Sequence, residues 1–365
     1  MKILDRYIIK KILFTYLFVA LILVLIISVI DMTEKMDKFS ANNLSVMQIA
    51  GYYMDFIPWI TGMITPITVF IAIVYVTSRL ASHTEIVAML SSGISFMRLL
   101  FPYFLGSLII ASLTFYFNGW VIPKSNRERL AFELQYFQNK YYFEKRNFHI
   151  QVAPDVYLYI QNYNNQSNIG YQFTLEKFNE NRMIEKLSAD NIQWDSLKNT
   201  WTLTYWKRKR VEDIFIEARS EIDTILTSGM TLDTLLAISP KDFENDKRKY
   251  DGMTIPELDE HIAKLKFRGA TGAEFYEVEK YTRYSAPFTI FVLVFMGIIV
   301  SSRKSRGGTG FQIALGFLLS FVFILFFTMS RTFAEAGSLS PWVAAWIPNA
   351  TFAILTLVMY RFVPR

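Results

Sequence analysis

The chain has 365 residues, a length that is enough for two or three domains. Of these residues 52% are hydrophobic, and the formal net charge is +6. It contains no cysteine, which excludes disulfides, a Cys-ligated metal centre and a catalytic thiol. The three histidines are scattered, without the H-E-x-x-H spacing of a zinc enzyme. We therefore expect neither a metal nor a cofactor.

Six apolar runs are long enough to cross a membrane, because a bilayer core about 30 Å thick needs about 20 apolar residues in a helix. They are residues 12–30, 56–78, 99–122, 284–300, 311–330 and 342–360. The second run contains Pro58 and Pro66, which spanning helices tolerate, and we expect a kink near Pro66. The first run lacks the small-residue cleavage site of a signal peptide, so we interpret it as a retained helix.

Basic residues divide unequally between the two sides of these spans. The short loops on one side contain eleven Lys and Arg, including a cluster at 303–306, whereas those on the other contain only Lys35, Lys38 and Arg331. The side richer in Lys and Arg is normally cytoplasmic, so both termini are expected in the cytoplasm. Residues 1–122 then hold spans one to three, residues 284–365 hold spans four to six, and residues 123–283 form a domain on the outer side.

In the inserted domain the hydrophobic pattern changes to period two, over about residues 145–228. Seven short strands are expected, at residues 148–152, 156–160, 171–178, 183–194, 201–205, 214–216 and 222–226. Residues 179–182 have the composition of a hairpin turn. The pattern predicts an antiparallel sandwich or open roll, whose edges can pair with another chain. The basic run 207–210 is interpreted as a solvated strand edge or turn, or as a contact for anionic lipid headgroups.

A helical segment is expected after the strands, at residues 254–268. Thr254 and Glu257 have the spacing of a capping box, and Pro256 falls in the first turn. Gly269 can end this helix in the left-handed conformation.

The loop between the second and third spans is expected to hold a short helix at about residues 82–92. Glu85 precedes an apolar stretch at 86–90, and Ser92 and Gly93 end it. Two interpretations stay open at this point. The segment is either an interfacial helix that joins two spans, or a coupling helix that docks in a basic, apolar cleft of a cytoplasmic partner.

Motifs for energy conversion and for catalysis are missing from the sequence. It has no G-x-x-x-x-G-K-[ST] phosphate loop and no G-x-S-x-G nucleophile elbow. No span carries the central charged residue of an ion-coupled pump. A transporter of this kind has to take its energy from a partner. Lys35, Lys38 and Arg331 fall at outer span ends, either as interface anchors or as contacts for the phosphates of an amphiphile.

Several short motifs occur in a characteristic order along the chain. They are residues 4–8 (LDRYI), Pro66 inside the second span, residues 84–89 (TEIVAM) followed by Ser92-Gly93, Pro287 at the start of the fourth span, and residues 346–352 (WIPNATF) in the last. With the 3+3 layout around a β domain, they make the whole chain resemble the lipopolysaccharide export permeases, the LptF/LptG or YjgP/YjgQ family, and LptG more than LptF.

The resemblance implies partners and a role. Two such permeases pair, and a cytoplasmic ABC ATPase dimer binds their coupling helices. The pair extracts lipopolysaccharide from the inner membrane and passes it to a periplasmic bridge of jellyroll proteins. The implied ATPase-coupling residues are Glu85, Ile86, Met89, Ser92 and Gly93. Phe70 and Phe321 are the candidates to line a lipid cavity between spans one, two and five.

One departure from the family concerns the outer end of the first span. LptG-type members carry basic residues there, and the first of these positions falls on Asp31. Lys35 and Lys38, one and two helical turns onward, are expected to substitute, and with Arg331 they are the candidates to contact lipid phosphates.

The sequence therefore predicts an α-helical membrane protein with six transmembrane helices and an inserted periplasmic, jellyroll-like all-β domain. The predicted protein is a non-catalytic permease subunit of the bacterial inner membrane, which contacts membrane lipids and does not bind nucleic acid. Two alternatives remain. One is a non-transporting scaffold that recruits periplasmic partners by strand addition. The other is a lipoprotein-releasing ABC permease, although such permeases resemble a four-span plan.

Overall fold

A computed structural model describes residues 3–137, 147–164, 167–180, 182–216, 219–234, 240, 249–268, 272–302 and 308–361. The chain divides into a helical unit and a unit that contains the β-sheet, and each is described by itself. The predicted basic cluster at 303–306 and the predicted helix end at Gly269 lie outside the described residues.

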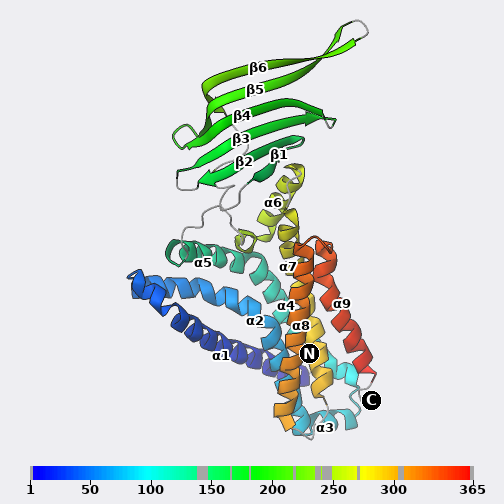
Figure 1. The fold of residues 1–365 in the computed structure, drawn as a ribbon. Helices are drawn as coiled ribbons and strands as arrows, with labels where there is room; N and C mark the ends of the chain where they lie inside the picture. The colour runs from blue at the N-terminus through cyan, green and yellow to red at the C-terminus, as the bar shows by residue number, and fades with distance from the viewer. Residues whose placement is uncertain are drawn as a thin grey trace. The chain divides into compact units, whose positions relative to one another are not determined.

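The helical unit contains the membrane-spanning segments (Figure 1). Its helices before the sheet are α1 (Ile3–Ala41), α2 (Val46–Ser82), α3 (Glu85–Ser91), α4 (Phe96–Tyr116) and α5 (Ile122–Tyr136), with a π-helical turn η1 (Phe117–Val121) between the last two. After the sheet come α7 (Ala273–Ser301), α8 (Gly308–Glu335) and α9 (Pro341–Tyr360). Among the described residues, six helical segments have the length and hydropathy of a membrane span. The 3+3 prediction is confirmed.

The first helix extends well beyond its apolar run. Helix α1 has 39 residues, and at 1.5 Å per residue it is roughly 58 Å long, about twice the thickness of a bilayer core. The apolar run explains only its middle. The polar turns at both ends form contacts with other helices, which are described with the site below.

The second helix contains both prolines that the sequence places in this span. Pro58 and Pro66 lie inside α2, and the helix bends along its length (Figure 1), as helices do where proline removes a backbone hydrogen bond. A capping box starts it, because the Ser45 N–H donates to Gln48 Oε1 at 2.9 Å and the Gln48 N–H donates back to Ser45 Oγ at 3.3 Å.

In the interior of the bundle, α2 packs against the C-terminal helices α7, α8 and α9. Phe70 is fully buried among residues of α7, α8 and α9. Its ring lies against Gly316 of α8, where an added Cβ would be 2.9 Å from Phe70 Cε1. The Thr289 hydroxyl donates to Asn349 Oδ1 at 2.8 Å, which links α7 to α9 by a buried hydrogen bond. Phe70, a predicted cavity-lining residue, is therefore part of the packed interior.

The described strands form one antiparallel sheet in the order β1-β2-β3-β4-β5-β6. Their bounds are β1 (Phe148–Ala153), β2 (Val156–Asn164), β3 (Ile169–Asn179), β4 (Arg182–Asp195), β5 (Thr200–Ile216) and β6 (Arg219–Thr234). The predicted β domain is confirmed, and of the two predicted forms the described strands make a single open sheet. Trp201 and Phe173 are almost completely buried in the apolar cluster of this unit.

Two details of the strand prediction are wrong. The described residues form six strands instead of the expected seven, because the predicted strands 201–205 and 214–216 are parts of one 17-residue strand, β5. The basic run 207–210 is not at an edge, since β5 pairs with β4 on one side and β6 on the other. Arg208 lies 3.2 Å from Glu185 across the β4–β5 pair, so part of this charge is paired within the sheet.

The predicted helix after the sheet is α6 (Ile255–Arg268). The Thr254 N–H donates to Glu257 Oε2 at 2.8 Å, which is one half of the predicted capping box. The Thr254 hydroxyl also donates to Glu257, at 3.0 Å. Arg127 of α5 binds the same carboxylate at 2.8 Å, a contact within the helical unit, to which residues 249–259 belong.

Candidate functional site

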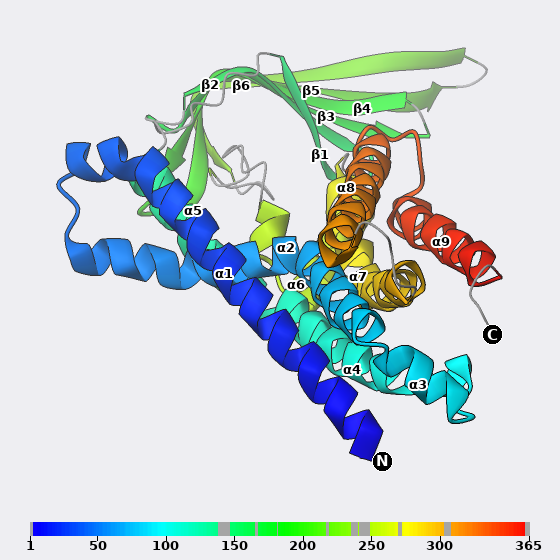
Figure 2. The same ribbon diagram turned by 90° about the horizontal axis from the view of Figure 1, so that it is seen from below.

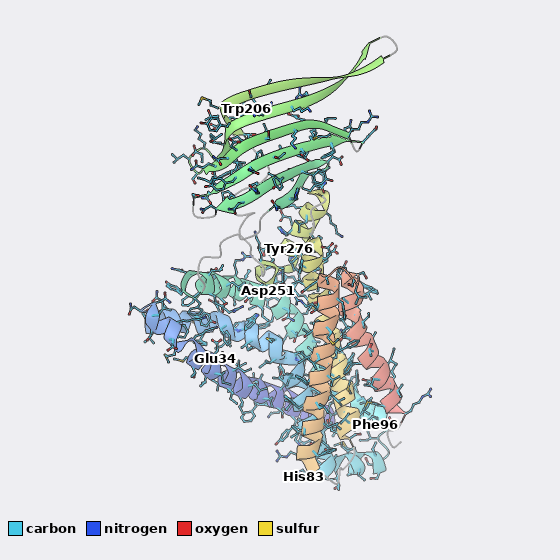
Figure 3. The ribbon with its side chains drawn as sticks, viewed as in Figure 1. Glu34, His83, Phe96, Trp206, Asp251 and Tyr276 are labelled. Atoms are coloured by element: carbon cyan, nitrogen blue, oxygen red, sulfur yellow. The ribbon has the colours of Figure 1, made fainter. Side chains whose placement is uncertain are left out.

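The short helix α3 joins two spans at the end of the bundle where α1 begins. His83 and Phe96 are labelled on either side of it in Figure 3. Thr84 precedes it in the left-handed conformation at φ 58°, and Gly93 follows it at φ +85°, a conformation that favours glycine. These two positive φ values end the neighbouring helices sharply, so α3 is a separate element of seven residues.

The two faces of α3 have different environments. Ile86 is 2% exposed and belongs to the main apolar cluster of the bundle, against which Met89 is also packed. Val87 is 61% exposed, and Ala88, Ser91, Ser92 and Gly93 are exposed as well. Of the predicted coupling residues, Ile86 therefore anchors the helix, whereas Ser92 and Gly93 lie on its accessible side.

The carboxylate of Glu85 is held by the first helix. Tyr7 donates its hydroxyl hydrogen to Glu85 Oε2 at 3.2 Å, and Lys11 Nζ lies 3.8 Å from Glu85 Oε1. Lys11 also donates to the Tyr7 hydroxyl and lies 4.4 Å from the centre of its ring. About one third of each side chain of the Lys11–Glu85 pair remains exposed, so Glu85 is partnered within the chain and accessible from outside it.

A second contact joins α1 to the residues that follow α3. Arg98, in the first turn of α4, binds Asp5 with both guanidinium NH groups, at 2.7 and 2.8 Å. Asp5 is 1% exposed, and a carboxylate that is buried in this way needs such a bidentate partner. The start of α1 thus contacts the loop at both ends, at Glu85 and at Arg98.

At its other end, α1 is joined to α2 and α5 by a second polar cluster. Lys35 Nζ lies 2.8 Å from Asp31 Oδ1 and 3.6 Å from Glu133 Oε1, and it also donates to the Tyr52 hydroxyl. Tyr52 in turn donates to Glu133 at 3.0 Å. The side chain of Lys35 is only 19% exposed, so this predicted phosphate contact is enclosed by two carboxylates and a phenol.

A buried arginine completes this second cluster. Arg129 is 3% exposed, binds Glu133 Oε1 at 2.6 Å and lies 4.1 Å from the centre of the Trp59 ring. Two bases and two acids therefore balance one another between α1 and α5; they are Lys35, Arg129, Asp31 and Glu133.

The other two candidate phosphate contacts differ in how they are partnered. Lys38 is exposed and forms no ion pair within the described residues; its ammonium lies 5.7 Å from the Phe137 ring. Arg331 binds Glu335 at 2.8 Å and Glu279 at 3.1 Å. Glu279 also pairs with Arg283 at 2.8 Å, so Arg331 belongs to a charge-balanced group on α7 and α8.

Two adjoining cavities lie within the helical unit. One, of about 190 Å³, is lined by residues that include Arg331, Glu279, Asp251 and Asn118; Asp251 is labelled in Figure 3. The other, of about 170 Å³, is more apolar and lies between α1, α2 and α4. Arg331 borders the first cavity, whereas neither cavity is lined by Phe70 or Phe321. Phe321 is 47% exposed on α8.

The sequence interpretation missed the partners of the candidate residues. Asp5, Tyr7, Lys11, Arg98 and Glu133 all contact another helix, and several of these contacts join residues about 80 to 100 positions apart in the chain. Their only signal in the sequence is polarity at a helix end, which is equally typical of a solvated turn.

The chain is similar to known proteins over almost its whole length. The family model of the lipopolysaccharide export system permeases LptF/LptG matches residues 6–361. The lipopolysaccharide export system permease protein LptG of Escherichia coli strain K12 is 20% identical over 357 residues, which are 97% of each chain. The LptG of Escherichia coli O6:H1 strain CFT073 matches with the same identity and coverage. The chain belongs to the LptF/LptG family of lipopolysaccharide export permeases.

Proposed function

We propose that this permease is one half of the membrane part of an ABC-type exporter, which extracts lipopolysaccharide from the bacterial inner membrane. A second, homologous permease forms the other half, and a cytoplasmic ATPase dimer drives the pair. Both termini and α3 lie on the cytoplasmic side, and the β domain lies in the periplasm. The charge distribution over the short loops supports this orientation.

The observation that carries this proposal is the division of α3 into an anchored face and an accessible face. Ile86 attaches α3 to the bundle, whereas the neighbouring Val87 is 61% exposed. An exposed apolar side chain beside the accessible carboxylate of Glu85 suits a cleft that is both apolar and basic. A helix of seven residues is only marginally stable by itself. Its attachment to the bundle through Ile86 stabilises it, so that it can transmit a force from a partner to the bundle.

The faces of α1 and α8 support a lipid pathway and a second permease. Helix α2 packs against both of them and lies between them in Figure 2. Only 17% and 22% of their apolar windows are buried, compared with 61% for α2. The exposed apolar faces of α1 and α8 lie on either side of α2. These faces are suited to form one wall of a cavity for acyl chains, and a second permease would form the other wall.

The candidates for phosphate contacts are now ordered by their partners. Lys38 is the candidate that keeps an exposed ammonium without an ion pair in the described part of the chain. Arg331 borders the polar cavity but already binds Glu279 and Glu335. Lys35 is enclosed. We therefore propose Lys38 first and Arg331 second, with Lys35 in a structural role.

The open sheet supplies a way out for the lipid. Its first and last strands in the described residues, β1 and β6, each pair on one side only, and an unpaired strand edge can extend a sheet onto another chain. We propose that the β domain passes lipopolysaccharide to a periplasmic bridge protein of similar fold by this edge pairing.

The coupling role is tested by purifying the chain with its ATPase and the second permease. Val87→Asp and Glu85→Ala are expected to reduce the amount of ATPase that copurifies, and to reduce lipopolysaccharide release in proteoliposomes. Val46→Asp is the matched control, because Val46 is 84% exposed at the opposite end of α2. Normal ATPase association and normal release in both variants would exclude α3 as the coupling element.

A scaffold that recruits partners by strand addition is the second candidate, and the unpaired edges of the sheet favour it. Photo-crosslinking separates the two functions. A photoreactive residue at Phe321 or Lys38 is expected to form lipopolysaccharide adducts in the exporter. A scaffold would give no such adducts there while still capturing a protein along β1 or β6.

A further inference from the structure

We infer that the first turns of α1 form a rigid strut to α3, with Tyr7 and Lys11 as positioning residues that pass the motion of α3 to the α1 span. This inference rests on the proposed coupling role of α3. It adds that the lipid-facing helix α1 is driven directly, through side chains on its own first turns.

The geometry at the loop provides the first part of the argument. Helix α1 contacts both ends of the α3 segment. It binds Glu85, the first residue of α3, and Arg98, which follows α3 in the first turn of α4. A single contact would act as a hinge, whereas two separate contacts also resist rotation. Because the Asp5–Arg98 pair is buried on the Asp5 side and bidentate, it is the fixed point, and the Tyr7–Lys11–Glu85 group is the second point.

The packing of α1 in the membrane provides the second part. Helix α1 packs against α2 and α4 on one side, but only 17% of its apolar window is buried, so most of its surface contacts no other described helix of this chain. Its polar contacts are concentrated at Lys11 and Lys35, which are 24 residues and therefore roughly 36 Å apart on a helix. A stiff helix that is fixed at its ends and exposes most of its surface between them moves as one rod when one end is displaced.

The chemistry of the group explains why Glu85 can serve both α1 and a partner. Tyr7 and Lys11 bind the two different oxygens of its carboxylate, and a carboxylate has about four lone-pair sites. About one third of the Glu85 side chain is exposed, so a basic group of a partner can approach it while α1 remains bound. The partner, Glu85 and α1 then form one continuous polar connection.

The test uses Tyr7→Phe and Lys11→Met, with Lys10→Met as the matched control. Lys10 is the neighbouring base, is exposed and lies 5.7 Å from the ring centre of Phe14 on its own helix. In reconstituted complexes, Tyr7→Phe and Lys11→Met are expected to keep ATPase association and ATP hydrolysis. The lipopolysaccharide released per ATP is expected to fall about fivefold, which corresponds to the loss of one partly exposed charged contact. Lys10→Met and the conservative Lys11→Arg are expected to release as much as wild type.

A distance measurement tests the strut itself. The chain has no native cysteine, so spin labels can be placed at Leu17→Cys on α1 and Ser91→Cys on α3, both exposed positions. The distance between them is expected to stay constant between the nucleotide-free and ATP-bound complex, and to change when Lys11→Met is added. A reference pair, Leu17→Cys and Leu357→Cys on α9, is expected to change with nucleotide in wild type.

Four results would overturn the inference, and the first three concern distances and release. They are a wild-type α1–α3 distance that changes with nucleotide, a reference distance that does not change, and release per ATP in Lys11→Met equal to that of Lys10→Met. A parallel loss of association and hydrolysis in Lys11→Met would also overturn it, because that pattern indicates a docking or folding role. These outcomes differ from failure of the proposed function, in which Val87→Asp and Glu85→Ala leave ATPase association intact.

Discussion

Lys35 Nζ lies 2.8 Å from Asp31 Oδ1, one helical turn earlier on α1. The resemblance to LptG-type permeases led us to expect a base at the position of Asp31. The carboxylate therefore changes what the next base does, because Lys35 pairs with Asp31, lies near Glu133 and is not left free for a lipid phosphate.

The first prediction follows from this pair. Lys35→Met leaves Asp31 without its ion-pair partner in a site that is mostly buried, while Glu133 keeps Arg129, so the free energy of unfolding is expected to fall by about 2 kcal/mol. Lys38→Met is expected to leave stability unchanged and to weaken lipopolysaccharide binding. Thermal unfolding in detergent and binding of labelled lipopolysaccharide measure the two effects. The assignment would be reversed if Lys35→Met were stable and Lys38→Met bound lipid normally.

The sequence predicted the parts of this fold that depend on local patterns. Long apolar runs identified the spans, alternation identified the strands, and the spacing of Thr254 and Glu257 identified the start of α6. The ion pairs Lys35–Glu133 and Asp5–Arg98 could not be predicted, because they join positions 98 and 93 residues apart. Polar residues at the end of a span look the same in a sequence whether they face solvent or another helix.

The same reason explains why the sequence did not show that Phe70 lies in the packed interior. An apolar residue of a span can face lipid, a cavity or another helix, and its type does not distinguish these environments. The close approach of Phe70 to Gly316 is visible only when α2 and α8 are placed side by side. Phe321 on α8 is exposed and remains a candidate to contact lipid.

The second prediction concerns this α2–α8 contact. A Cβ at position 316 would lie 2.9 Å from Phe70 Cε1, so Gly316→Val is expected to force the two helices apart and to destabilise the bundle by about 1–3 kcal/mol. Phe70→Leu, which is smaller at that point, is expected to restore part of the loss in the double variant. Unfolding midpoints of the two single variants and the double variant measure the coupling. Simple addition of the two losses would show that the contact does not limit the approach of the helices.

The third prediction concerns the buried link between α7 and α9. Thr289 donates to Asn349 Oδ1 at 2.8 Å, and Asn349 donates to the Ser285 carbonyl oxygen at 3.1 Å. Interhelical hydrogen bonds in membrane proteins contribute about 0.6 kcal/mol on average. Thr289→Val is expected to lose about this amount and Asn349→Leu somewhat more, because two hydrogen bonds disappear. A double-mutant cycle in bicelles should give a coupling energy of similar size, and a coupling of zero would contradict the link.

The fourth prediction concerns the pH dependence of the tie between α5 and α6. The Thr254 N–H, together with Arg127, holds the pKa of Glu257 below its ordinary value of 4.5. Because the pKa is lower in the folded state, the stabilisation is present above pH 4.5 and is lost as the pH falls through the folded pKa. The Glu257 side chain is 44% exposed, so after solvent screening the effect is about 0.5 kcal/mol.

Glu257→Gln isolates this contribution, because glutamine keeps the size of the side chain and removes the charge. Near neutral pH the wild type is expected to be slightly more stable than Glu257→Gln in thermal unfolding. Below pH 4.5 the two curves are expected to converge, since protonated Glu257 no longer attracts Arg127. Arg127→Met removes the other partner of the ion pair, so its stability is also expected to approach that of the wild type below pH 4.5. A stability difference that persists unchanged at acid pH would assign the effect to hydrogen-bond geometry at the cap instead of to charge.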